Sequence, residues 1–147
     1  MTPEIRDALP ADEAAWRRLW AGYLDYYGVT LAPEVTAHTW GRMMDPGGRL
    51  KARLACLDGR VASFAMYLRH ESSWVIGEDC YLEDMFVAPD ARGRGIARAL
   101  IDDLAALARA KGWRRLYWHA DQANAPARRL YDSYVQADGH IRYRMVL

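Results

Sequence analysis

The sequence has few cysteines, no long apolar run and almost no net charge, and each shortage excludes a class of protein. Its two cysteines, Cys56 and Cys80, belong to no CxxC pair and no Cys/His cluster, so we predict neither a zinc site nor a disulfide framework. The apolar runs fall far short of the roughly 20 residues that a membrane helix needs, and the N-terminus has no apolar signal core. We therefore expect a cytoplasmic protein that does not enter a membrane.

The charge of the chain is nearly balanced. It has 20 Lys and Arg residues against 19 Asp and Glu residues, a formal net charge of +1. Because no global positive field is available to hold a phosphate backbone, we predict no binding to nucleic acid. The 147 residues, of which 52% are hydrophobic, suit one domain over 1–147 with one ordinary core.

The hydrophobic pattern changes along the chain between a helical period and a period of two. It predicts helices over 13–27, 33–44, 96–110 and 124–134, and strands over 4–8, 49–57, 60–70, 79–87, 115–120 and 140–147. Asp12 is a candidate N-cap of the first helix, and Asp58-Gly59 is a two-residue hairpin signal. The order β-α-α-β-β-β-α-β-α-β predicts a mixed α/β fold with two helix pairs packed on one twisted sheet.

A loop rich in glycine and arginine, between a predicted strand and a predicted helix, carries the main chemical signal. Gly93 and Gly95 lack the Cβ atoms that would hinder a sharp turn close to a ligand. The free N–H groups at the start of the helix from Ile96 form an anion site, to which Arg92 and Arg94 add side-chain donors. A dinucleotide fingerprint fails because an arginine stands at its third glycine position, and the lysine of a P-loop is missing. We predict a bound pyrophosphate; the alternative is an ordinary strand-to-helix connection.

Two motifs in this half of the chain resemble one enzyme family. The R-x-x-G-x-A pattern over 92–97 resembles the pyrophosphate loop of the GCN5-related N-acetyltransferases (GNAT), and N-x-x-A-x-x-L-Y over 124–131 is similar to their late-helix motif. YLEDMFVAPDARGRG and LYWHADQANAPARRLYD resemble the branch with the fungal histone, polyamine and D-amino-acid acetyltransferases. The resemblance implies a mostly antiparallel sheet with helices on both faces, and an acyltransferase that uses acetyl-CoA and no metal.

The resemblance also implies roles for individual residues. The pantetheine arm would pair as an added strand with backbone groups of Met85, Phe86 and Val87. The pyrophosphate would be bound by backbone N–H groups of Arg92, Gly93, Arg94, Gly95, Ile96 and Ala97. Asn124 would bond the pantetheine or a water molecule, and Tyr131 would protonate the leaving thiolate.

The acceptor amine needs a group that takes its proton. An alkyl ammonium has a pKa of about 10.4, so forming the neutral nucleophile at pH 7 costs about 4–5 kcal/mol. The family often places an acidic base on this strand, and alternation puts Glu83 on the sheet face of Met85, so Glu83 is the first candidate. Asp84 points to the other face unless a bulge intervenes; with Tyr27 it is expected to bind the acceptor. No activated cysteine is evident, so we expect direct transfer in a ternary complex.

Several of these residues also have a purely structural interpretation. Glu83 fits an ion-pair partner of an arginine, Tyr131 fits a core aromatic, and the tyrosines of the first helix fit a packing stripe. His119 is interpreted as a buried histidine and not as a base. The leading hypothesis is acetyl transfer to a primary amine, with a small cationic amine or an amino acid favoured. The alternatives are a non-catalytic acyl-CoA-binding regulatory module and a protein or histone lysine acetyltransferase.

The end of the chain bears on the oligomeric state. The family usually closes with two strands after the last helix, whereas this sequence has only one clear strand there. The sheet would then end in an exposed edge, a feature that proteins usually cover. We therefore expect a homodimer in which a second subunit covers the edge.

Overall fold

The computed structural model describes residues 2–147, in which a five-stranded sheet lies between helices. The strands are β1 (Glu4–Asp7), β2 (Leu50–Leu57), β3 (Arg60–Glu71), β4 (Glu78–Val87) and β5 (Leu116–Trp118). The helices are α1 (Glu13–Tyr27), α2 (Pro33–Met44), α3 (Ile96–Lys111) and α4 (Ala125–Asp132), with short 3-10 turns η1 (Pro10–Asp12) and η2 (Pro89–Ala91). The predicted mixed α/β fold is confirmed.

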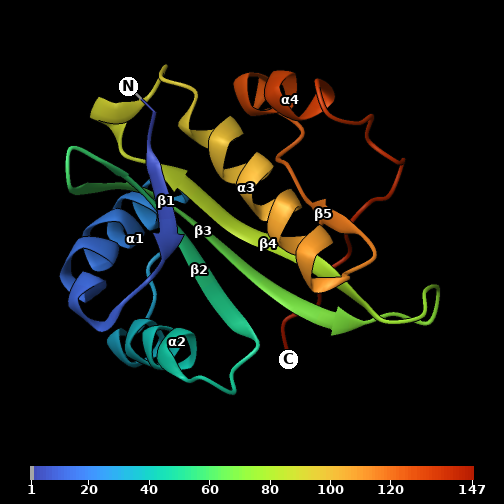
Figure 1. Ribbon diagram of the computed structural model, residues 1–147, viewed down its shortest axis with the longest axis horizontal. Coiled ribbons are helices and arrows are strands. Elements are labelled where there is room, and N and C mark those ends of the chain that lie inside the picture. Colours follow the sequence, from blue (N-terminus) through green and yellow to red (C-terminus); the bar gives the residue numbers. More distant parts are fainter. Residues whose placement is uncertain (1) are drawn as a thin grey trace.

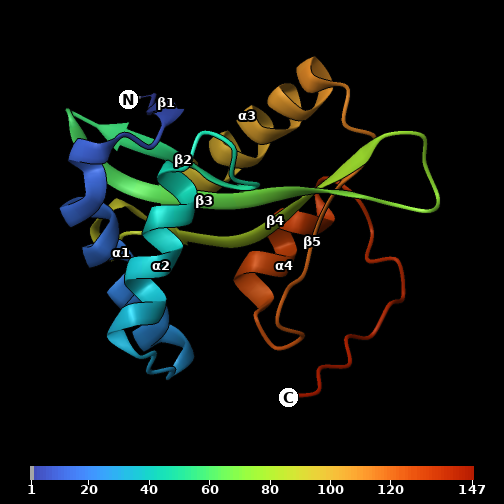
Figure 2. The ribbon, with the colours of Figure 1, turned by 90° about the horizontal axis from the view of Figure 1, so that it is seen from below.

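The strands follow one another across the sheet in chain order. β1 to β4 are antiparallel neighbours, and β5 runs parallel to β4 after the crossover through α3. α3 lies on one face, and α1 and α2 lie on the other (Figure 1, Figure 2). The hairpin predicted at Asp58-Gly59 is confirmed, since both residues have positive φ, 51° and 76°, as a tight turn with right-handed twist requires.

The core forms on both faces of the sheet from residues at the predicted spacing. Ile96, Leu100 and Leu104 lie one turn apart along α3 and are buried against β2, β3 and β4. On the other face, Trp16 and Trp20 of α1 stack with ring centroids 5.3 Å apart. Cys56 and Cys80 are free and buried. No helix within residues 2–147 is long and apolar enough to cross a membrane.

The strand predicted over 140–147 is wrong, because that segment forms no ladder within the described residues. Its alternation of apolar and polar residues is typical of a strand, yet a strand also needs a neighbour for its backbone N–H and C=O groups. Val135 N donates to Tyr131 O, and no backbone hydrogen bond beyond it joins the tail to the rest of residues 2–147. Tyr143 and Met145 are consequently 91% and 83% exposed.

The predicted cap of α1 is also wrong. Asp12 already has near-helical dihedral angles and makes no side-chain bond to the helix. Its carboxylate instead accepts two hydrogen bonds from Arg6, of 2.7 and 2.9 Å, and one of 2.7 Å from Leu9 N. These bonds hold the pKa of Asp12 below its ordinary value, with the Arg6 bonds the main cause. Asp12 therefore fastens β1 to the turn before α1.

Candidate active site

The chain leaves β4 through η2 and enters α3 through two glycines in the left-handed region. Gly93 has φ +76° and Gly95 has φ +74°. A Cβ atom at either position would meet nothing within 4 Å, so the glycines serve the backbone conformation and not a tight contact. Ala99 N donates to Gly95 O at 3.0 Å and makes the first hydrogen bond of the helix.

The turn leaves backbone donors free in front of α3. No backbone N–H from Gly93 to Arg98 makes a well-formed hydrogen bond to another backbone group of residues 2–147, although the turn at Arg92 and Gly93 engages one of them weakly. These groups lie at the positive end of a 16-residue helix, where an anion is stabilised by the dipole and by the N–H groups. Backbone donors in this arrangement are able to bind an anion, and that this loop binds a pyrophosphate stays a prediction.

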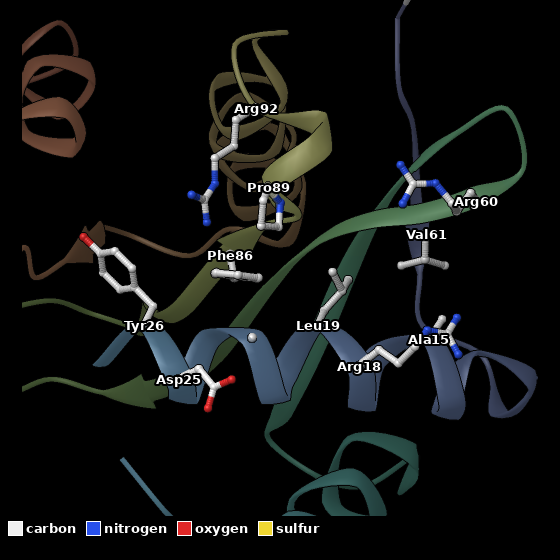
Figure 3. Close-up of a pocket in the computed structure, with 11 residues that line it drawn as sticks. Ala15, Arg18, Leu19, Asp25, Tyr26, Arg60, Val61, Phe86, Pro89 and Arg92 are labelled. Carbon is white, nitrogen blue, oxygen red and sulfur yellow. The ribbon is translucent and has the colours of Figure 1, made fainter. Parts of the chain in front are cut away.

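The Arg92 side chain turns away from these amides. Its Nε donates to Val87 O at 3.1 Å, and its guanidinium lies 5.4 Å from the centre of the Phe86 ring. It thereby reaches the wall of a cavity of about 620 Å³ between α1 and the end of β4 (Figure 3). Arg18 and Arg60 line the same cavity, and Arg60 pairs with Asp90 at 3.0 Å. The cavity adjoins the loop, but none of the predicted catalytic side chains lines it.

β4 loses its neighbour on one side before it ends. β5 pairs only with Cys80–Leu82, so the β4 backbone beyond Leu82 has no partner toward β5 among the described residues. The Phe86 carbonyl faces β3, where it accepts a 2.7 Å hydrogen bond from the Ser63 hydroxyl. Since neighbouring residues of a strand present their N–H and C=O groups to opposite sides, those of Met85 and Val87 face the open side. Val87 O already accepts the bond from Arg92 Nε, so an extended ligand can pair mainly with Val87 N and with the backbone groups of Met85.

A bulge in β4 decides which acidic side chain faces α1. Asp84 lies opposite Met66 and Leu82 lies opposite Tyr67, so Glu83 is skipped in the pairing with β3. The alternation that favoured Glu83 over Asp84 therefore does not continue through this point. Glu83 is exposed and makes no hydrogen bond or ion pair among the described residues.

Asp84 is held in a less polar setting. Its Oδ1 accepts a hydrogen bond of 2.7 Å from the Tyr23 hydroxyl. Burial raises the pKa of Asp84 to about 6; the bond from Tyr23 opposes this rise and the charge of Glu83 adds to it. A carboxyl group with this pKa is largely ionised at pH 7 and can still exchange a proton near neutrality.

Tyr23 and Tyr27 of α1 lie near Asp84, and Tyr131 of α4 lies near Tyr27. The Tyr23 and Tyr27 rings meet edge to face, with centroids 5.0 Å apart. Burial is the main cause that raises the pKa of Tyr27, and the charges of Asp121 and Asp84 add to the rise. Tyr131 is half-buried and meets the Trp118 ring edge to face at 5.5 Å. Burial raises the pKa of Tyr131, and the nearby Tyr27 raises it further. The phenol of Tyr131 therefore stays protonated and can act as a proton donor.

The remaining predicted residues occupy other positions. Asn124 is the N-cap of α4, and its side-chain oxygen accepts a hydrogen bond of 3.3 Å from Ala127 N. The prediction that His119 is buried is wrong: it is exposed because it follows the edge strand β5, and its Nδ1 lies 3.2 Å from the Tyr81 hydroxyl. Tyr23, which the sequence could not distinguish from a packing residue, is the direct partner of Asp84.

Comparisons with known proteins show that this chain is similar to acetyltransferases. Residues 13–134 match the acetyltransferase (GNAT) family. The chain is 34% identical over 137 residues to a D-amino-acid N-acetyltransferase of Saccharomyces cerevisiae, covering 92% of this chain and 85% of the relative. It is 36% identical over 120 residues to an aminoglycoside N(6')-acetyltransferase type 1 of Stenotrophomonas maltophilia, covering 78% and 72%.

The fold also matches solved structures. A ribosomal-protein-alanine N-acetyltransferase from Brucella melitensis superimposes with a TM-score of 0.81 over 100% of both chains, at 22% sequence identity. At this identity the match concerns the fold alone, which agrees with the layers and strand order of the sheet.

Proposed function

The chain belongs to the acetyltransferase (GNAT) family, and from this premise we propose that it transfers the acetyl group of acetyl-CoA to the primary amine of a small molecule. It is an N-acetyltransferase by its family and its relatives. Those relatives are named for D-amino acids and aminoglycosides, which supports a small cationic amine or an amino acid as the acceptor.

One observation carries the proposal: the open edge of β4 leads directly to the free amides in front of α3. Backbone groups of Met85 and Val87 would pair with the amide-containing pantetheine arm as an added strand. The N–H groups from Gly93 to Ala97 would bind the pyrophosphate, and the exposed Arg94 side chain would add a cation. Asn124, which caps α4, would bond the pantetheine directly or through water.

The proposed reaction is a direct attack of the amine on the thioester carbonyl. The ammonium form of the acceptor first gives a proton to a carboxylate, and the neutral nitrogen attacks the thioester carbonyl carbon to form the C–N bond. The C–S bond breaks and the leaving thiolate takes a proton from Tyr131. The Tyr131 phenolate then recovers the second proton that the nitrogen loses as the amide forms. Asp84 is supported as the proton acceptor by its burial and its pKa of about 6. Glu83, its neighbour in the bulge, stays the alternative base, acting through water. Tyr27 would border the acceptor.

The function is tested by release of free thiol from acetyl-CoA in the presence of amino acids of both hands, polyamines, aminoglycosides and basic peptides. We expect turnover with at least one small amine and tight CoA binding in calorimetry. CoA binding without turnover would favour a regulatory module, and a preference for basic peptides would favour a protein lysine acetyltransferase. Absence of CoA binding would refute the assignment.

Two variants separate the candidate bases. If Asp84 takes the proton, Asp84→Asn lowers kcat/KM by about 10²–10⁴ at pH 7 and less at high pH, where free amine is plentiful. Glu83→Gln then has a much smaller effect. The reverse order assigns the base to Glu83, and a loss that is the same at every pH excludes the base role for the residue concerned.

We also propose a homodimer, because the outer edge of β5 and the exposed apolar side chains of the C-terminal tail both lack a partner in residues 2–147.

A further inference from the structure

We propose that a row of aromatic side chains beside Asp84, built on Tyr81 and Tyr117, binds an aromatic ring of the acceptor, so that the preferred substrates are amines with an aryl group about two carbons from the nitrogen. This inference rests on the proposed transferase function. The row lies outside the cavity of Figure 3.

The row is a connected set of rings from three strands. Tyr81 and Tyr117 stack with ring centroids 4.9 Å apart at 14°. The His70 ring meets Tyr117 edge to face at 5.7 Å, and the His119 ring meets Tyr81 in the same way at 5.5 Å. Each histidine also lies within hydrogen-bond distance of a tyrosine hydroxyl, 2.7 Å for His70 Nε2 to Tyr117 and 3.2 Å for His119 Nδ1 to Tyr81.

The hydrogen bonds of His70 fix the orientation of Tyr117. His70 Nδ1 lies 2.7 Å from the Glu71 carbonyl oxygen, which can only accept. Nδ1 therefore carries the proton, and in the neutral ring Nε2 accepts the hydroxyl proton of Tyr117. A tyrosine held at its hydroxyl end keeps its ring in place and loses little entropy when a ligand stacks on it.

The bulge places this row on the same sheet face as Asp84. Tyr81 lies opposite Leu68 and Asp84 lies opposite Met66, and these two β3 residues share a face because they are two apart. Because Met66 and Leu68 are two residues apart, Asp84 and Tyr81 lie about 7 Å apart along the sheet. An amine that contacts Asp84 can therefore reach the tyrosine pair with a ring two carbons away.

The row is open to a ligand. Tyr81 and Tyr117 are half-buried and His119 is exposed, although these are large rings on the face that carries α1 and α2. α1 contacts Phe64 and Phe86, farther along the same face, and α2 packs on β2. Among the described residues no helix lies above this aromatic surface, and the C-terminal tail borders it through Arg142, near Tyr81.

Stacking, and not charge, favours an aryl ring on the row. Burial raises the pKa of Tyr81, Glu83 adds to the rise, and the nearby Arg142 guanidinium opposes it. Arg115 lies near Tyr117 but is paired with Asp79 at 2.7 Å. The carboxylates of Glu83 and Asp84 thus oppose the charge of Arg142 around Tyr81. An aryl ring gains stacking energy that does not depend on this balance.

The test compares 2-phenylethylamine with its saturated counterpart, 2-cyclohexylethylamine, in thiol release. We expect the wild-type enzyme to favour the aryl amine. Tyr117→Leu keeps the apolar volume but removes the ring, and should raise KM for the aryl amine about tenfold with kcat nearly unchanged. Tyr117→Phe keeps the ring and should retain the preference. Trp74→Ala, which removes an exposed ring from the β3–β4 turn, is the matched control and should change nothing.

Each outcome bears on one hypothesis. Equal kcat/KM for both amines in the wild type, or an equal loss for both in Tyr117→Leu, would overturn the aromatic subsite while leaving the transferase intact. If no amine is turned over, the proposed function fails, and calorimetry with 2-phenylethylamine in the presence of CoA still tests the row. Binding that Tyr117→Leu weakens about tenfold supports it, and unchanged or absent binding refutes it.

Discussion

Asp84 is an ionisable group whose surroundings oppose its charge. Burial raises its pKa to about 6, against an ordinary value of 3.8. Between these two values the folded state binds more protons than the unfolded state, so ionisation of Asp84 lowers the free energy of unfolding as pH rises from about 4 to about 6. Above about pH 6 the full free-energy cost of burying the charged Asp84 remains.

We therefore expect Asp84→Asn to stabilise the protein at pH 8. The amide oxygen can still accept the hydrogen bond from Tyr23, and the buried charge is gone. The free energy of unfolding should rise by about 1–3 kcal/mol at pH 8, and the gain should shrink toward pH 4. Urea unfolding at both pH values measures it. Glu83→Gln, an exposed neighbour, should change stability much less, and a destabilised Asp84→Asn at pH 8 would contradict the electrostatic account.

Tyr131 has a different role, as a donor whose proton must stay in place until the thiolate forms. Burial raises the pKa of its phenol, so it is protonated throughout the neutral range. Tyr131→Phe keeps the edge-to-face contact with Trp118 and removes only the hydroxyl. We expect kcat to fall about 10²-fold with little change in Kd for CoA or in Tm. If kcat in steady-state assays is unchanged, Tyr131 is not the proton donor and serves only to pack against Trp118.

The sequence suggests candidate residues for the site but does not predict how they are paired. The order of the motifs along the chain suggests Glu83, Asp84 and Tyr131 as candidates, and their roles stay predictions. The sequence cannot predict the bulge, which depends on how β3 pairs with β4 across the Met66–Tyr67 step. For the same reason it misjudges His119, whose exposure follows from the position of β5 at the sheet edge.

At the scale of elements, the turn into α3 depends on the left-handed conformation of its glycines. Gly95→Ala would force a Cβ into φ +74°, at a cost of about 1–2 kcal/mol, and would disturb the free amides. We expect a small fall in Tm and at least a tenfold rise in Kd for CoA in calorimetry. Gly59→Ala is a matched control, since it has φ +76° and open space but lies in the β2–β3 hairpin. It should lower Tm similarly and leave CoA binding unchanged; equal Kd values for both variants would exclude the loop as the anion site.

The helices and the strands β2, β3 and β4 are predicted well, and the strands after α3 are not. α3 begins at Ile96 and ends before Gly112, as its apolar spacing and its glycines indicate. β5 is only three residues long, where the apolar pattern over 115–120 favours a longer strand. The pattern over 140–147 is equally typical of a strand, but its hydrogen bonds depend on a partner that the pattern does not specify.

At the scale of the whole molecule, the sheet is protected unequally at its two ends. β1 is short and carries charged residues at both ends, Glu4 and Asp7, which discourages further pairing. β5, in contrast, has no charged residue and lies at an edge, beside the part of β4 that has no partner on this side. The side of the sheet that would bind the coenzyme is thus also the side left open to association.

The C-terminal tail supplies a matching surface for that edge. Ile141, Tyr143 and Met145 alternate with polar residues and are largely exposed, so pairing with β5 of a second copy would satisfy both the backbone and the apolar side chains. We expect light scattering at micromolar concentration to give twice the 16.8 kDa mass of one chain. Deletion of residues 140–147 should convert the dimer into a monomer, while Trp74→Ala, which removes an exposed apolar residue elsewhere, should leave it dimeric. A wild-type monomer would exclude the dimer, and a dimer that survives the deletion would show that the tail is not its contact.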